Sequence, residues 1–377
     1  MSAPSRVLHV IDSLDLGGAQ TLLLDICKHA DRARFEVSIA AMHGNGVFAP
    51  AFKQEGITVY SLSPGKWIPA YLWSFPKLLW TLRPDILHFH LFGSNLIAKP
   101  IAWLAGWRAL VVHDHCNDVG RGNPALLLGD AIANRISSQV IAVSKSVRDF
   151  LISREGIDPD RVTILSNGID TEVFRPATGP QKQEARLRLG IPANAFVIGG
   201  VGRLVAQKNF SLFLDVAAAV LAAYPGVLFV IAGTGPLELQ LKAKASVLGI
   251  NGRLYFLGHV ADRLALYHSM DALLLTSDFE GTPMTLLEAM ACELPVVASA
   301  VDGVAEVCTD GRDALLVASH DLGDYVATLG KILEDQSLAG YLGGEARQRV
   351  VEKYEIRALV RRIEGIYEGI LAEKTAH

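Results

Sequence analysis

The chain has 377 residues, half of them hydrophobic and a fifth charged, with a formal net charge of −4. A single hydrophobic core stops growing near ~250–300 residues, so we expect two folded domains. The charge balance gives no reason to expect nucleic acid as a partner, since binding it calls for a basic domain or stripe. No signal-peptide pattern opens the chain and no run of ~18 apolar residues occurs, which predicts a cytoplasmic protein without a membrane span. The scattered cysteines, without a CxxC pair, predict reduced thiols: Cys27, Cys116, Cys292 and Cys308.

Short apolar runs alternate with helical spacing through the first half of the chain. Such alternation predicts a parallel sheet covered by helices on both faces. The expected strands are residues 7–11, 35–40, 86–90, 110–113 and 140–143, and the clearest helical stretches are 19–30 and 144–152.

The same pattern restarts after the polar, Pro- and Gly-rich stretch Arg175–Pro180, with strands expected at 196–200, 228–232, 254–257, 272–275 and 295–298. We therefore predict an α/β fold of two doubly wound, Rossmann-like parallel-sheet domains facing across a cleft. The expected boundaries are 1–172 for the first domain, 173–190 for a linker, 191–354 for the second domain, and 355–377 for a final helix crossing back to the first. Ligands of such sheets bind at the carboxyl ends of the strands.

Glycines and cations follow two expected strands of the second domain. One strand ends in Gly199-Gly200-Val201-Gly202-Arg203, and Lys208 follows with four residues between it and Arg203. Glycine lets the backbone approach an anion, while Arg and Lys bind phosphate oxygens. The next strand leads into Gly233-Thr234-Gly235, which is short of a full dinucleotide fingerprint. Each turn alone is more often an ordinary strand-to-helix connection.

The segment from Phe279 to Glu288 carries the strongest signal. Thr282 and Pro283 predict a helix start, which directs the free amides of Met284 and Thr285 at an anion. Carboxylates beside phosphates are electrostatically costly unless they bind hydroxyls, and sugar or ribose hydroxyls meet that need. The alternative, two solvated glutamates, leaves Glu288 without an evident partner among its apolar neighbours.

In this order, the motifs resemble those of the retaining glycosyltransferases of family 4, which have the two-domain GT-B fold. The resemblance covers nearly the whole chain and rests on Asp85–His90, Ala142–Ser144, Ser166–Asp170, Gly202-Arg203, Lys208, Phe256–Val260, and the glutamates 280 and 288 with seven residues between them.

The resemblance implies a role for each matching residue. Arg203 and Lys208 hold the donor diphosphate and stabilise the leaving group, Glu280 contacts the transferred sugar, and Glu288 binds the ribose. The expected donor-binding set also includes Gly17, Gly18, Gly233, His259, Val260, Gly281, Thr282, Met284 and Thr285. Two positions depart from the family pattern: Glu293 stands where glycine is frequent, and Asp302-Gly303 stands where a Gly-Gly pair is frequent.

Histidines gather at expected strand ends of the first domain: His88, His90, His113 and His115. A lone histidine is more often structural. A metal site is the alternative for such a set, although no nearby carboxylate spacing strongly supports it. The resemblance implies that the diphosphate is held by side chains and a helix dipole, so we expect neither a catalytic metal nor a cofactor. The resemblance places an active-site histidine at His115, with Asp114 and His113 as runners-up. Asp158-Pro159-Asp160 resembles a metal-binding pair but has the composition of a turn.

All five tryptophans fall in the first domain, three of them in the aromatic segment 66–80. Tryptophan suits the boundary between lipid and water, so this segment is either core or a peripheral membrane contact.

The expected reaction is transfer of a sugar, with retention, from a nucleoside diphosphate sugar, UDP favoured, to an acceptor hydroxyl. A lipid-linked glycan of cell-surface polysaccharide assembly is the expected acceptor. The alternatives are a nucleotide-sugar epimerase of the same fold and a non-catalytic, nucleotide-binding partner subunit.

Overall fold

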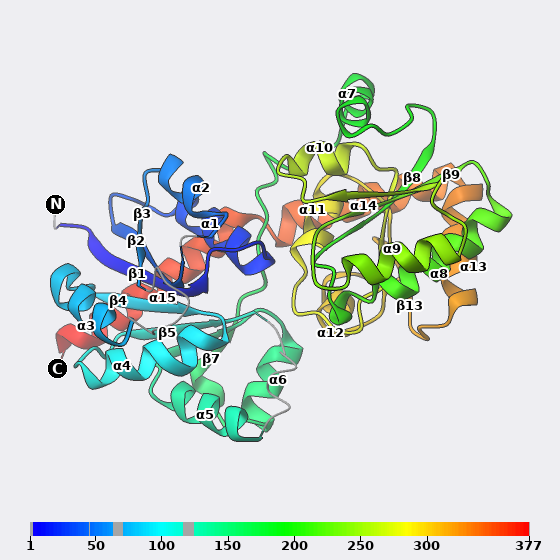
Figure 1. The fold of residues 1–377 in the computed structure, drawn as a ribbon. Helices are drawn as coiled ribbons and strands as arrows, with labels where there is room; N and C mark the ends of the chain where they lie inside the picture. Colours follow the sequence, from blue (N-terminus) through cyan, green and yellow to red (C-terminus); the bar gives the residue numbers. More distant parts are fainter. Residues whose placement is uncertain (1–2, 45, 63–70, 116–123, 377) are drawn as a thin grey trace. The chain divides into compact units, whose positions relative to one another are not determined.

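The computed structural model describes residues 3–44, 46–62, 71–115 and 124–376. The chain divides into two compact units (Figure 1). Unit 1 comprises Met1–Gly168 with Ile356–His377, and unit 2 comprises Ile169–Glu355. The segment 173–190 thus lies in unit 2, and the last helix lies in unit 1.

The described residues of unit 1 form a seven-stranded parallel sheet in the order β3-β2-β1-β4-β5-β6-β7. The strands are β1 (Ser5–Ser13), β2 (Phe35–His43), β3 (Thr58–Ser61), β4 (Ile86–His90), β5 (Leu110–Asp114), β6 (Gln139–Ala142) and β7 (Val162–Ile164). The helices are α1 (Gly18–His29), α2 (Ala49–Gln54), α3 (Tyr71–Leu82), α4 (Lys99–Leu104), α5 (Pro124–Arg135), α6 (Lys145–Ser153) and α15 (Ile356–Ala376).

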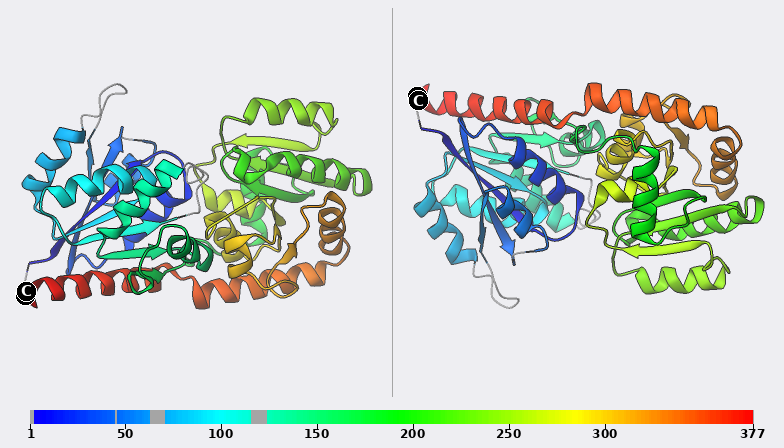
Figure 2. Two further views of the ribbon diagram at one scale, coloured as in Figure 1. Left: turned by 90° about the horizontal axis from the view of Figure 1, so that it is seen from below. Right: turned by 90° about the horizontal axis from the view of Figure 1, so that it is seen from above.

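Side-chain alternation along the strands of unit 1 separates two cores. Leu8, Val10 and Phe89 point to one face, where Phe75 and Leu79 of α3 cover them. The opposite face carries a smaller core, in which α1 and α2 pack on the sheet. Helix α15 lies against α1 on this second face (Figure 2). Period-two alternation in the sequence therefore assigns each strand residue to one helical layer.

In the described part of unit 2 a six-stranded parallel sheet has the order β10-β9-β8-β11-β12-β13. The strands are β8 (Phe196–Val201), β9 (Val227–Ala232), β10 (Leu254–Gly258), β11 (Ala272–Leu275), β12 (Val296–Ser299) and β13 (Leu315–Val317). The helices are α7 (Gly179–Leu189), α8 (Phe210–Ala223), α9 (Glu238–Val247), α10 (Arg263–His268), α11 (Met284–Ala291), α12 (Asp302–Val307), α13 (Leu322–Glu334) and α14 (Gln336–Lys353).

Two doubly wound parallel sheets confirm the predicted fold class. Every expected strand is present, whereas the edge strands β3, β7 and β13 were not predicted. These three have only three or four residues each, too few for a clear periodicity. Asp158, expected to start a turn, caps the short 3₁₀ turn Pro159–Arg161. Within the described residues no helix is both long enough and apolar enough to cross a bilayer.

Candidate functional site

Strand-end loops of unit 2 are held together by backbone hydrogen bonds. The Leu204 amide donates to the Thr234 carbonyl at 2.9 Å, and the Gly233 amide donates to the Gly258 carbonyl at 2.7 Å. Gly233 has φ +142°, and a Cβ there would lie 1.9 Å from the Gly202 carbonyl oxygen. Only glycine fits this approach, so the loops after β8, β9 and β10 form one continuous edge.

Lys208 and Glu280 meet at this edge as an ion pair. The Lys208 ammonium donates to Glu280 Oε1, and the Ser277 hydroxyl donates to the same oxygen at 2.7 Å. Glu280 is only 6% exposed. Gln207 fixes the two loops further by donating to the Phe279 carbonyl at 3.0 Å. The structure therefore brings together the residues that we assigned to the diphosphate and to the sugar.

Arg203 lies two residues beyond the end of β8, and its side chain is exposed. Among the described residues no hydrogen-bond or ion-pair partner is found for its guanidinium. A free cation beside a glycine-lined backbone is available for an anion.

Helix α11 starts one residue later than Thr282 suggested. Pro283 is the N-cap residue, and it supplies no side-chain cap. In the described part of the chain, the amides of Met284 and Thr285 donate to no carbonyl, and the Thr285 hydroxyl is buried without a partner. The helix start therefore offers polar groups to a ligand.

The loop before α11 rests on the start of α12. The Gly303 amide donates to the Glu280 carbonyl at 3.2 Å. A Cβ on Gly303 would lie 1.3 Å from the Gly281 carbonyl oxygen. The second residue of Asp302-Gly303 must therefore be glycine for the loop that carries Glu280 to take this position.

Both departures from the family pattern lie in the left-handed region of the backbone, with φ +63° at Glu293 and +28° at Asp302. Glycine adopts such angles without the steric cost that a Cβ imposes. Glycine would suit these two positions for a conformational reason, and in this chain Glu293 and Asp302 hold them at a steric cost.

Glu288 projects from α11 into an almost closed environment, being 1% exposed. Its carboxylate accepts from Arg263 of α10, the partner that sequence reasoning did not identify. Burial raises the pKa of Glu288, and the Arg263 charge opposes this shift. Arg263 also lies 5.3 Å from the centroid of the Phe174 ring.

His259 and Val260 follow β10, at the far edge of the sheet from β11. Strand β9 lies between β10 and β8, the strand that leads to Lys208. His259 is exposed. The structure thus distributes the expected donor residues along one edge of unit 2, with the base-binding candidates at one end.

In unit 1, Gly17 is the extended N-cap of α1 and Gly18 is its first residue. A Cβ on Gly17 would lie 2.4 Å from the Gln20 amide oxygen. Gln20 in turn donates to the Ser13 carbonyl at 3.1 Å, which fastens this turn to the end of β1. Asp12 links the same end to the loop after β4, since its carboxylate accepts from the Gly93 amide at 2.9 Å.

His115 follows β5, with Nε2 3.3 Å from Nδ1 of His90. Its Nδ1 is buried and has no hydrogen-bond partner among the described residues. Burial lowers the pKa of His115 to about 4. The ring is therefore neutral at pH 7 and can donate or accept one hydrogen bond at Nδ1.

Helix α3 separates its aromatic residues into two faces. Phe75 and Leu79 are buried in the core, whereas Trp73 is 84% and Trp80 61% exposed. Neighbouring α4 adds Leu104, which is 77% exposed. Core packing therefore does not account for these two tryptophans. Residues 66–70, which include Trp67, lie outside the described residues, as does Cys116.

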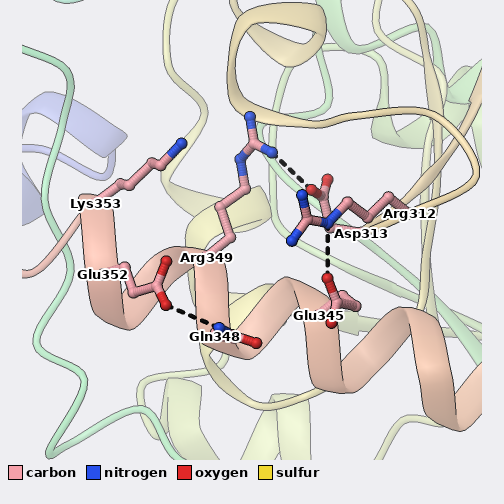
Figure 3. A pocket seen from close by; sticks show the side chains of 7 residues that line it. All are labelled: Arg312, Asp313, Glu345, Gln348, Arg349, Glu352 and Lys353. Carbon is pink, nitrogen blue, oxygen red and sulfur yellow. Dashed lines mark hydrogen bonds and ion pairs between the residues drawn. The ribbon is translucent and has the colours of Figure 1, made fainter.

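A surface hollow of unit 2 lies away from these strand ends, between α14 and the loop before β13 (Figure 3). Its charges neutralise one another: Arg349 pairs with Asp313 and Arg312 with Glu345, both at 2.7 Å. This pairing leaves little net charge for a ligand.

Two family models match the chain, one over most of unit 1 and one within unit 2. A family model described as Glycosyltransferase Family 4 matches residues 16–173, and one described as Glycosyl transferases group 1 matches residues 181–349. Together the two models cover most of the chain, which is therefore a glycosyltransferase, and its two parallel sheets give it the two-domain GT-B fold. This confirms the resemblance stated from its motifs.

Curated relatives align over most of their length. An Escherichia coli UDP-Gal:α-D-GlcNAc-diphosphoundecaprenol α-1,3-galactosyltransferase is 27% identical, over 80% of this chain and 79% of its own. A D-inositol 3-phosphate glycosyltransferase of Catenulispora acidiphila is 28% identical, over 89% and 86%.

Solved structures share the fold. Anabaena Alr3699/HepE, in complex with UDP and glucose, superimposes with a TM-score of 0.85 and 22% identity, covering 97% of this chain and 100% of its own. A sucrose-phosphate synthase from Thermosynechococcus elongatus has a TM-score of 0.83 and 17% identity, covering 98% and 100%.

Proposed function

We propose that this glycosyltransferase takes its sugar from a UDP-sugar and transfers it, with retention of anomeric configuration, to a hydroxyl of a lipid-linked glycan. The Lys208–Glu280 pair carries the proposal, because it couples a phosphate-binding cation to a hydroxyl-binding carboxylate at one strand edge. The E. coli relative supports the choice of donor and acceptor, since its name states a UDP-sugar and a diphosphoundecaprenol-linked acceptor.

The donor diphosphate is assigned to Arg203, Lys208 and the helix start at Met284 and Thr285. Departure of the nucleoside diphosphate breaks the bond from the anomeric carbon to the phosphate oxygen and develops negative charge there. Preorganised cations and amide dipoles stabilise that charge without reorganising. Because these groups supply the positive charge, the diphosphate is held without a metal ion.

The sugar and the nucleoside have separate partners. Glu280 accepts hydrogen bonds from sugar hydroxyls, and Glu288 accepts from the ribose. His259 and Val260 contact the base through their backbone, while Gly233, Gly281 and Thr282 line the donor. From unit 1, His115 contacts the sugar through Nδ1, and Gly17 and Gly18 approach the donor.

Retention follows from attack on the face from which the diphosphate departs. The acceptor oxygen forms its bond to the anomeric carbon, and its proton passes to the departing phosphate oxygen. This route needs no covalent nucleophile, and both acids of the site are already engaged, Glu280 with Lys208 and Glu288 with Arg263.

The test is a transfer assay with a panel of UDP-sugars and undecaprenyl-diphosphate-linked monosaccharides, with the anomer of the product determined by NMR. We expect an α-linked product from an α-linked donor. An inverted product would contradict the mechanism. Epimer formation from donor alone would identify an epimerase, and UDP binding without transfer or hydrolysis would identify a non-catalytic subunit.

We further propose that the exposed face of α3 and α4 contacts the membrane that holds the acceptor. Trp73, Trp80 and Leu104 present apolar and aromatic surface that suits the lipid–water boundary.

A further inference from the structure

Five histidines lie on one face of the sheet of unit 1. In the register of the strands, His9 of β1 lies opposite His88 of β4, and His90 lies opposite His113 of β5. His115 is two residues beyond His113 and its ring stacks on it, with centroids 4.4 Å apart. Since side chains alternate along a strand, all five rings project toward the same helical layer.

Several of their nitrogens are buried without partners. His113 is completely buried, and neither Nδ1 nor Nε2 has a hydrogen-bond partner among the described residues. His88 Nε2 and His115 Nδ1 are in the same condition. A neutral imidazole carries one N–H donor and one lone pair, and leaving either unpaired in a protein interior is unfavourable. A ligand bound to His113 would account for its unpaired ring nitrogens.

A chain of hydrogen bonds between histidines accounts for only part of the cluster. His9 Nδ1 lies 3.0 Å from His90 Nε2, and His90 Nδ1 lies 3.3 Å from His115 Nε2. His88 is fixed separately, by the Tyr367 hydroxyl of α15 at 2.6 Å from its Nδ1. His113 takes no part in any of these bonds.

We infer that His90, His113 and His115 bind a divalent transition-metal ion of the kind that prefers imidazole, such as Zn²⁺ or Co²⁺. One ring nitrogen from each of these residues lies within 4.8 Å of the others. Two nitrogens on a tetrahedral zinc ion are about 3.3 Å apart, from Zn–N bonds of ~2.0–2.1 Å. The 3.3 Å between His90 Nδ1 and His115 Nε2 has this value.

The surroundings of the three histidines also suit a bound cation. His9 holds the other nitrogen of His90 and thereby orients that ring, as outer partners of metal ligands do. Asp114 places negative charge close to His115, which compensates part of the charge of a dication.

Three imidazoles leave a fourth coordination position, the arrangement of open rather than closed zinc sites. His115 is the least buried of the three residues. An ion on Nε2 of His115 also leaves the proton on Nδ1, the nitrogen assigned above to the sugar. This last consequence rests on the proposed function, whereas the metal site itself does not.

The experiment is a titration of untagged, chelator-treated protein with Co²⁺, followed by visible absorption. We expect one Co²⁺ per chain with the intense bands of four-coordinate cobalt, and displacement by Zn²⁺. His113→Gln and His115→Gln should each weaken binding by about tenfold or more. His29→Gln, on α1 outside the cluster, should leave the affinity unchanged.

Absence of four-coordinate bands in the unaltered protein overturns the site, as does unchanged affinity in the His115→Gln variant. If His113→Gln does not fold, the partly buried His115 decides the question alone. No donor sugar is present in this titration. If the protein binds Co²⁺ but transfers no sugar, the proposed function is contradicted and the metal site is not.

Discussion

Lys208 and Glu280 are hydrogen-bonded to one another, although 71 residues separate them in the chain. Both side chains are largely buried, with 14% and 5% exposed. Lys208, which we assign to the phosphates, therefore holds the side chain of Glu280, which we assign to the sugar. A donor that binds here takes over a preformed pair rather than two independent side chains.

Removing one partner of this pair should destabilise unit 2 by about 3 kcal/mol, because an uncompensated charge stays buried. We expect this cost for Lys208→Met and recovery of most of it when Glu280→Gln is added. Urea unfolding of the four proteins of the double-mutant cycle measures the coupling. Strictly additive effects would show that the pair contributes nothing to stability.

Arg203 and Lys208, the two cations assigned to the diphosphate, should affect turnover alike but stability differently. Arg203→Met and Lys208→Met should each lower kcat by a factor on the order of 10²–10³, comparable to losing one oxyanion donor. Only the Lys208 variant should also lose stability, since Arg203 is exposed. Lys242→Met, which removes an exposed lysine paired with Glu238, is the matched control. Full turnover by Lys208→Met would refute the assignment.

UDP affinity should fall as the pH drops through the pKa of Glu288, because only the carboxylate accepts from both ribose hydroxyls. Burial raises this pKa above 4.5 and Arg263 opposes the rise. Arg263→Met should therefore move the loss of affinity to higher pH. Titration calorimetry with UDP between pH 5 and 8 measures the shift.

The raised pKa of Glu288 also determines how the stability of the protein changes with pH. The folded state binds the Glu288 proton more tightly than the unfolded state, so this group lowers stability as the pH rises above 4.5. Arg188→Met serves as the control, since Arg188 pairs with Asp262 at the surface. An identical pH profile in the Arg263 and Arg188 variants would disprove the role of Arg263.

Glu293→Gly should stabilise the protein by about 1 kcal/mol. Glu293 has φ +63°, where a Cβ costs roughly 1–2 kcal/mol, and the added freedom of glycine in the unfolded chain offsets part of the gain. Thermal unfolding measures the change. Gln348→Gly, at an exposed position in the body of α14, should instead destabilise by about 1 kcal/mol. A lower melting temperature for Glu293→Gly would contradict the strain argument.

Membrane contact should depend on the exposed tryptophans of α3. We expect the intact protein to float with anionic lipid vesicles, and Trp73→Ala combined with Trp80→Ala to abolish flotation. Leu187→Ala combined with Leu239→Ala removes similarly exposed leucines from unit 2 and should have no effect. Flotation that persists in the tryptophan variant, or that is absent from the intact protein, would rule out this surface.

Much of the fold was predictable because local physics determines it. Buried parallel strands are continuous apolar runs, so β4, β9 and β11 were recognised from sequence within a residue or two. The short edge strands were missed because half of their pairing is absent and their pattern is weak. Helix α11 was expected from Pro283, with an error of one residue at its start.

The sequence by itself determined the fold class, the family and the kinds of chemistry available: two cations, two acids, a helix start and glycine-lined turns. The tertiary structure decided which of these meet. Arg263 reaches Glu288 across 24 intervening residues, and His9 joins a cluster whose other members come from β4, β5 and the end of β5. Strand register and helix packing set these contacts, and neither can be read from local periodicity. The positive φ of Glu293 likewise comes from its position just after the end of α11, and not from any preference of glutamate.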